Sequence, residues 1–172
     1  NTGCHKLVFF STDMTYGIPT VCPVPPSHPQ NPLGPYGNSK ILAERIIRGE
    51  NSIDATIFRP RLITGPGRLG ILGKLFKLIQ HGLPVPMIGS GNNRYQMVSV
   101  EDCALAAELA VAKNCPNINL NLGSSTPPPT KELLGGVIKH AKSKSILLPV
   151  PAGLLKPVLR SEERRVGKEC RS

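Results

Sequence analysis

The sequence lacks tryptophan, and aromatic residues make up only 4% of its 172 residues. It has no apolar run approaching the roughly 18 residues of a membrane-spanning helix. Its first residues, Asn1 to Lys6, lack the three-part pattern of a secretory signal. A hydrophobic fraction of 40% is nevertheless enough to build a core. We therefore expect a soluble, cytoplasmic protein with no membrane partner.

Metal-ligand motifs are also missing. The five cysteines are widely spaced, without a C-x-x-C pair and without a histidine at ligand spacing. They are Cys4, Cys22, Cys103, Cys115 and Cys170. We expect free thiols in a reducing compartment and no metal site.

Acidic residues are scarce relative to basic ones, with 11 Asp and Glu against 21 Lys and Arg and a net charge of +10. Such a charge suits nucleic acid, anionic lipid or a phosphorylated small molecule. The basic residues are dispersed, however, and no helix-turn-helix, zinc or RNA-binding motif accompanies them. A non-catalytic basic binding module is therefore the less favoured alternative, and we expect a small-molecule substrate rather than a nucleic-acid partner.

The hydrophobic pattern alternates between short apolar runs and helical periodicity. It predicts strands at Lys6–Phe10, Ala55–Phe58, Ile118–Leu122 and Ile146–Val150. It predicts helices at Tyr36–Gly49, Leu69–Gly82, Val100–Asn114 and Thr130–Lys142, the last capped by Thr130. Alternating strands and helices are typical of an α/β fold with a parallel sheet, in which the first strand would be buried. Between the first strand and the first helix, Gly17 to Pro35 holds seven prolines, which predicts a long ordered loop.

Tyr36 and Lys40 are the first residues that suggest chemistry. They lie four positions apart on a predicted helix, so both side chains emerge on one face. A fixed ammonium near a phenol favours the phenolate, which suits the pair to general acid/base catalysis. Ser11 and Thr12 follow one predicted strand, and Arg59, Pro60, Arg61 and Leu62 follow the next. The carboxyl ends of parallel strands are where open α/β sheets bind their ligands.

Four stretches together resemble the extended short-chain dehydrogenases/reductases, the NAD-dependent epimerase/dehydratase family. They are Phe9–Gly17 (FFSTDMTYG), Pro32–Lys40 (PLGPYGNSK), Phe58–Gly67 (FRPRLITGPG) and Ile88–Asp102 (IGSGNNRYQMVSVED). The resemblance implies the C-terminal part of a Rossmann-type doubly wound parallel sheet and a small substrate-binding subdomain. It places the latter part of the dinucleotide-binding domain in residues 1–66, and the subdomain, with elements that return to the sheet, in residues 67–159.

The resemblance also implies roles for individual residues. Thr12, Tyr36 and Lys40 would be catalytic, with NAD or NADP as the hydride carrier. Ser11, Tyr36, Lys40, Pro60, Arg61 and Leu62 would bind the cofactor, and Thr12, Met14, Leu62 and Arg94 the substrate. The parent enzyme would act on a hydroxyl or carbonyl group of a nucleotide sugar, and we expect it to be a homodimer.

Some positions depart from the family pattern. Leu62 stands where many nucleotide-sugar enzymes have Asn, and the spacing around Arg94 is closer to that of the hydroxysteroid dehydrogenases. A hydrophobic alcohol or ketone is therefore an alternative substrate, and a non-catalytic cofactor-binding protein is a further alternative.

The chain differs from a complete member of the family in two ways. The glycine-rich turn that binds pyrophosphate is absent, so we expect an N-terminally truncated chain that is inactive by itself. Residues 160–172 (RSEERRVGKECRS) resemble a translated sequencing adapter and are interpreted as a non-native tail.

Overall fold

The computed structural model describes residues 3–66 and 72–151. Within them the chain divides into two units. The first unit comprises residues 3–65 and 96–124, and the second comprises residue 66 together with 72–95 and 125–151.

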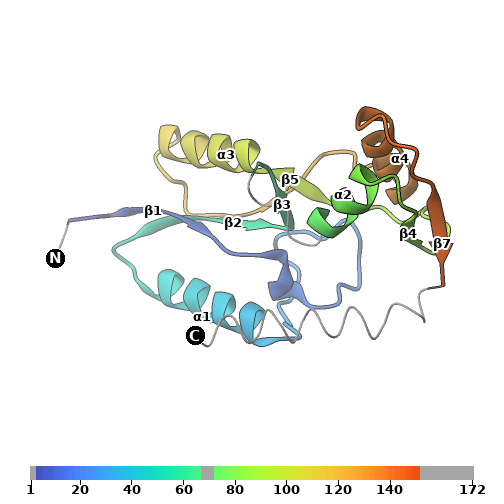
Figure 1. The fold of residues 1–172 in the computed structure, drawn as a ribbon. Helices are drawn as coiled ribbons and strands as arrows, with labels where there is room; N and C mark the ends of the chain where they lie inside the picture. The colour runs from blue at the N-terminus through green and yellow to red at the C-terminus, as the bar shows by residue number, and fades with distance from the viewer. Residues whose placement is uncertain (1–2, 67–71, 152–172) are drawn as a thin grey trace. The chain divides into compact units, whose positions relative to one another are not determined.

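The first unit is built on a parallel sheet with the strand order β1-β2-β6. These strands are β1 (Lys6–Phe10), β2 (Asp54–Pro60) and β6 (Asn119–Leu122). Helix α1 (Pro35–Gly49) covers one face of the sheet and α3 (Val100–Ala112) the other (Figure 1). The predicted α/β class with a parallel sheet is confirmed.

Strand β2 is the buried centre of this sheet. All of its residues except Asp54 are buried, whereas β1 is half-exposed. The prediction that the first strand is buried is therefore wrong for the described residues, because β1 pairs on one side only, with β2. The register aligns Phe10 with Phe58, and their ring centroids lie 5.4 Å apart. The residues after β1 and those ending β2 consequently reach the same edge of the sheet.

The end of β2 differs from the prediction. The predicted strand stopped at Phe58, but Arg59 and Pro60 continue the ladder opposite Asn121 and Leu122 of β6. Proline is tolerated at the last position of a strand because the ladder needs no further N–H donor from it. Arg59 is therefore a buried strand residue and does not lie on an exposed rim.

Three short elements of the first unit escape prediction. They are η1 (Asp13–Tyr16) and the parallel pair β3 (Leu62–Thr64) and β5 (Met97–Ser99). Segments of three or four residues are too short to display a period of either 2 or 3.6 residues.

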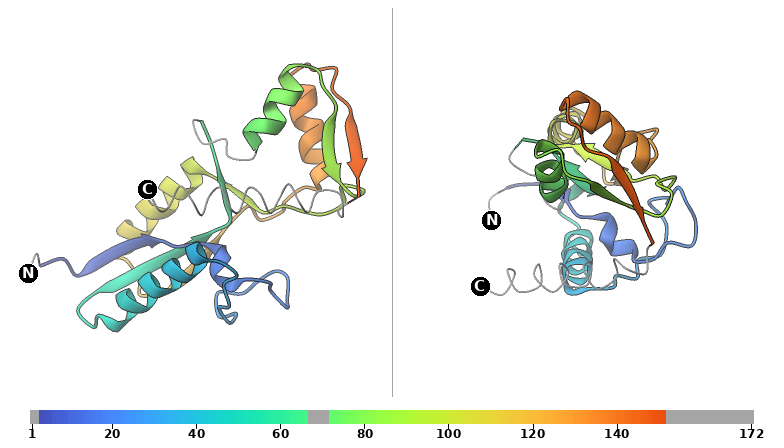
Figure 2. Two further views of the ribbon diagram at one scale, coloured as in Figure 1. Left: turned by 60° about the horizontal axis from the view of Figure 1, so that its bottom comes forward. Right: turned by 45° about the vertical axis from the view of Figure 1, so that its right-hand side comes forward.

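The second unit pairs two parallel strands with two helices. Strand β4 (Val85–Ile88) pairs with β7 (Leu147–Val150), and α2 (Leu72–Gln80) and α4 (Thr130–His140) lie beside them (Figure 2). Its core contains the buried side chains Ile79, Val85, Met87 and Leu134. Strand β4 was not predicted, since two prolines flank or interrupt it.

The predicted helices and the last two predicted strands are confirmed to within a few residues at each end. Residues 69–71 of the second predicted helix and the interpreted tail 160–172 lie outside the described residues. Thr130 is not the cap of α4: Pro129 occupies that position, and Thr130 donates both its N–H and its hydroxyl to the Asn93 carbonyl, at 2.8 and 2.9 Å. A helix long and apolar enough to cross a membrane does not occur in the described ranges.

Candidate active site

Helix α1 presents Tyr36 and Lys40 on one face, as their spacing predicts. The Tyr36 side chain is accessible, with 41% of the residue exposed. The Lys40 ammonium donates a hydrogen bond to the Phe10 carbonyl at 2.9 Å and lies 6.0 Å from the centroid of the Tyr36 ring. It also lies 4.9 Å from the centroid of the Phe9 ring. The cation is thus held between the end of β1 and the phenol.

Thr12 begins the η1 turn directly after this strand end. It is 6% exposed, and its hydroxyl accepts a hydrogen bond from the Met14 N–H at 3.3 Å. Gly37, the neighbour of Tyr36, packs so closely on this turn that a Cβ there would lie 2.8 Å from the Met14 carbonyl oxygen. The first turn of α1 and the η1 turn therefore adjoin, and three predicted catalytic residues lie on adjoining segments.

Ser11 precedes Thr12 and is also buried. Its N–H donates to the Phe58 carbonyl at 2.7 Å, which extends the pairing of β1 with β2 by one residue. Its hydroxyl makes no hydrogen bond of normal geometry, yet it is close enough to the Glu44 carboxylate to help lower the pKa of that group. The Ser11 side chain thus faces α1 from the end of β1.

An ion pair joins the end of β2 to η1. Arg61 Nη1 lies 2.8 Å from Asp13 Oδ2, and Arg61 is exposed. Burial raises the pKa of Asp13 above its ordinary value, although the nearby Arg61 opposes this shift. Among the other predicted contacts, Pro60 is buried, Leu62 is half-buried and Met14 is 53% exposed. Pro60, which ends β2, and Arg61, which is bonded to Asp13, therefore lie at the same end of the sheet as Thr12.

Arg94 belongs to the second unit. Its guanidinium donates to the Pro127 carbonyl at 2.6 Å, and its backbone pairs with Pro129 in an antiparallel bridge. Arg94 remains exposed.

Sequence reasoning missed a buried ion pair beside these residues. Glu44 and Arg59 have side chains only 5% and 4% exposed, and their carboxylate and guanidinium are joined by two bonds of 3.0 and 2.6 Å. Burial disfavours the charged carboxylate, but hydrogen bonds from Arg59 and Gln30 and the nearby Ser11 hydroxyl outweigh it, so the pKa of Glu44 is lowered. Glu44 follows Lys40 by four residues, so the periodicity of α1 was a signal that could have pointed to it.

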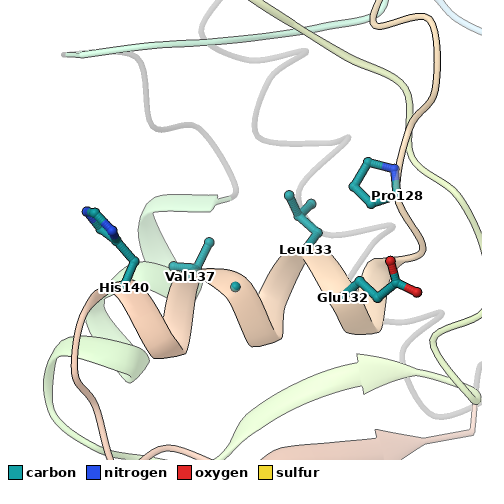
Figure 3. Close-up of a pocket in the computed structure, with 6 residues that line it drawn as sticks. Pro128, Glu132, Leu133, Val137 and His140 are labelled. Atoms are coloured by element: carbon teal, nitrogen blue, oxygen red, sulfur yellow. The ribbon is translucent and has the colours of Figure 1, made fainter.

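A shallow pocket lies elsewhere, in the second unit. One face of α4 lines it with Glu132, Leu133, Gly136, Val137 and His140, next to Pro128 (Figure 3). No predicted site residue contributes to it. Its lining is mainly apolar and comes from one helix and its preceding loop, so it offers no converging set of catalytic groups.

The first unit holds donors that fit one end of a dinucleotide. The Lys40 ammonium and the Tyr36 hydroxyl are hydrogen-bond donors of the kind that can bind the hydroxyl groups of a ribose. In the described part of the chain, no group of three or more His, Cys, Asp or Glu side chains forms a metal site.

Known proteins are similar to this chain in sequence. The model of the NAD dependent epimerase/dehydratase family matches residues 1–123. A protein of Sinorhizobium fredii is 35% identical over 156 residues, covering 88% of this chain and 39% of that protein. A UDP-glucose 4-epimerase of Rhizobium leguminosarum is 27% identical over 159 residues, covering 78% of this chain and 49% of the relative.

Solved structures show the same fold. The Bordetella bronchiseptica enzyme WbmG, in complex with NAD and UDP, superposes with a TM-score of 0.75 at 21% identity, over 87% of this chain and 48% of that one. UDP-glucuronic acid 4-epimerase from Bacillus cereus, in complex with NAD, gives 0.71 at 22% identity, over 84% and 50%. The chain therefore spans half or less of the length of these proteins.

Proposed function

Because the chain belongs to the NAD-dependent epimerase/dehydratase family, we propose that it carries the acid/base residues of an NAD(P)-dependent enzyme that acts on a hydroxyl or carbonyl group. The observation that carries the proposal is the placement of Lys40, which is bonded to the end of β1 and lies 6.0 Å from the Tyr36 ring. The chain spans half or less of the length of these relatives, so the proposal concerns the whole enzyme.

In this proposal Tyr36 moves the proton. Its exposed phenol is placed to give a proton to, or take one from, the reacting substrate oxygen. The Lys40 ammonium places a positive charge beside the ring of this phenol. The Thr12 hydroxyl, on the adjoining turn, donates a hydrogen bond to the same substrate oxygen and orients it.

The cofactor would be NAD or NADP, held at its nicotinamide end by Tyr36, Lys40, Ser11, Pro60, Arg61 and Leu62. When bound, the nicotinamide supplies the hydride acceptor or donor. Both solved structures described above contain NAD, and a further one that shares the fold, RMD from Pseudomonas aeruginosa, contains NADPH.

A nucleotide sugar is the substrate class we favour, because several relatives are UDP-glucose 4-epimerases and one solved structure contains UDP. Thr12, Met14, Leu62 and Arg94 would contact it. A hydrophobic alcohol or ketone is the second candidate. It is favoured by the apolar Leu62, which offers no hydrogen bond to a sugar.

The test uses the full-length enzyme encoded by the reading frame that contains this chain. It would be incubated with NAD or NADP and either UDP-glucose, UDP-glucuronic acid or a hydroxysteroid, with products separated by chromatography. We expect turnover of a UDP-sugar, and we expect Tyr36→Phe to lower kcat by about 10²–10⁴-fold, the usual contribution of a general acid or base.

Tyr95→Phe is the matched control. Tyr95 is 44% exposed, close to the 41% of Tyr36, so the change removes a phenol hydroxyl of similar accessibility. It should leave kcat near that of the unmodified enzyme. An enzyme whose kcat is unaffected by Tyr36→Phe would contradict the acid/base assignment, and turnover of the steroid alone would favour the second candidate.

A further inference from the structure

Glu44 continues the face of α1 that carries the proposed acid/base pair. Tyr36, Lys40 and Glu44 follow one another at intervals of four residues, so one stripe of the helix holds all three. The stripe is exposed at Tyr36, half-buried at Lys40 and buried at Glu44. The rotation of α1 about its own axis that buries the Glu44 side chain therefore also leaves Tyr36 exposed.

Arg59 fixes that rotation from the sheet. Its guanidinium binds both carboxylate oxygens of Glu44, a two-bond geometry that restrains direction as well as distance. Arg59 lies on β2, the central strand, in register with Asn121 of β6, so its backbone is set by the sheet. Strand β2 therefore restrains helix α1 through Arg59. The same strand also bonds the residue that follows β1, because the Phe58 carbonyl accepts a hydrogen bond from the Ser11 N–H.

The same guanidinium reaches the η1 turn and the proline-rich loop. Arg59 Nη1 donates to the Tyr16 hydroxyl at 2.8 Å and to the Pro26 carbonyl at 2.9 Å. Tyr16 in turn donates to Asn121 Oδ1 at 2.7 Å, and the Asn121 amide donates to the Val24 carbonyl at 2.7 Å. Tyr16 ends the turn that Thr12 begins, so the network also holds the Thr12 turn.

Gln30 closes the network on the helix side. Its amide donates to Glu44 Oε2 at 2.9 Å, so the loop is bonded at Val24, Pro26 and Gln30. This loop joins the Thr12 turn to the helix that carries Tyr36. A single buried cluster thus bonds to every segment on which the three proposed catalytic residues lie.

We propose that Glu44 and Arg59 are positioning residues, whose buried ion pair sets the rotation of α1 and the seat of the η1 turn so that Tyr36, Lys40 and Thr12 converge. The inference rests on the proposed function. Such a pair adds little net stability compared with apolar side chains of similar size, because the desolvation of two charges offsets most of their attraction. The pair instead fixes the relative orientation of the helix, sheet, turn and loop that its hydrogen bonds join.

The experiment compares Glu44→Gln with Asp54→Asn in the full-length enzyme, under conditions where both are folded. Asp54 forms an ion pair with Lys6 across β1 and β2, but the side chains are 52% and 39% exposed. Glu44→Gln keeps the size of the side chain and removes the charge that holds Arg59. We expect it to lower kcat by about 10-fold or more, since small displacements of reacting groups are costly. KM should change little, and Asp54→Asn should match the unmodified enzyme.

Two readouts separate positioning from general stability. Hydrogen exchange at the amides of residues 17–34 and 36–40 should be faster in Glu44→Gln and unchanged in Asp54→Asn. Glu44→Asp, which retains the charge, should recover part of the lost kcat.

A folded Glu44→Gln enzyme with unmodified kcat and unmodified loop exchange would overturn the inference. If Glu44→Gln does not fold, Gln30→Ala takes its place. It removes one bond to the carboxylate and should lower kcat and speed loop exchange to a smaller extent; unchanged values would again overturn it. Failure of the proposed function gives a different result, namely a Tyr36→Phe enzyme with full activity. In that case the exchange measurement still tests the positioning role.

Discussion

The two units of the chain bury their interiors with different chemistry. The first unit encloses an ion pair and several hydroxyl groups, with Ser11, Thr12, Thr15, Thr56, Glu44 and Arg59 all buried. The second unit has a core of Ile79, Val85, Met87 and Leu134, and Ser145 is its one buried polar residue among those described. All the predicted site residues except Arg94 lie in the unit with the polar interior.

The contrast between the two interiors shows that stability and the orientation of segments depend on different interactions. Apolar burial is favourable wherever side chains pack, but it is not directional. Buried polar groups need partners at defined distances and angles, so they restrain the relative orientation of the segments they join. The unit that carries the proposed chemistry accordingly contains the bonds that orient a helix, a turn and a loop, whereas the other unit is held together mainly by packing.

The largest effect should come from breaking the buried pair of the first unit. Glu44→Gln leaves the Arg59 charge buried without its carboxylate, so we expect the free energy of unfolding to fall by about 3–5 kcal/mol. Urea unfolding followed by circular dichroism measures this loss. A change below about 1 kcal/mol would mean that the pair behaves like an exposed one.

The apolar core of the second unit should be nearly as sensitive. Leu134 is 4% exposed in α4, and Leu134→Ala should lower the free energy of unfolding by about 3 kcal/mol through lost burial and the cavity left behind. The matched control is Leu148→Ala, at a position 45% exposed on β7. Equal losses for the two variants would contradict the assignment of Leu134 to the core.

A pH dependence should distinguish the two interiors. The pKa of Glu44 is lowered from its ordinary 4.5, so its contribution to stability is complete above that pH and disappears as the pH falls through the folded-state value. The difference in unfolding free energy between the unmodified chain and Glu44→Gln should shrink over this acid range, by about 1.4 kcal/mol for each unit of lowering.

The contribution of Asp13 to that pH dependence is common to both proteins and cancels in the difference. Leu134→Ala, measured over the same range, should show a constant loss. A Glu44→Gln difference that stays flat or grows as the pH falls would contradict the prediction.

The smallest effect should come from the exposed pair of the first unit. Asp54→Asn removes the partner of Lys6, yet water and salt already screen these charges. We expect a loss of roughly 0.5 kcal/mol, measured by urea unfolding and reduced further in high salt. A loss approaching that of Glu44→Gln would mean that burial does not separate the two pairs.

Several features of the fold and site followed from local pattern. The four-residue spacing of Tyr36 and Lys40 placed both on one face of α1, because a helix turn has nearly that period. The strands and helices of the alternating pattern were located for the same reason. Thr130 was misassigned as a cap because its acceptor, the Asn93 carbonyl, lies 37 residues away.

The sequence by itself determined the alternation of strands and helices, the parallel sheet and the stripe that joins Tyr36 to Lys40, since each depends on residues within about two turns or one strand. Only the tertiary structure decided which charges are buried together. Glu44 meets Arg59 across 15 residues, and Tyr16 meets Asn121 across 105. The physical reason is that periodicity records which face of an element is apolar, whereas the partner of a buried polar group depends on how separate elements pack.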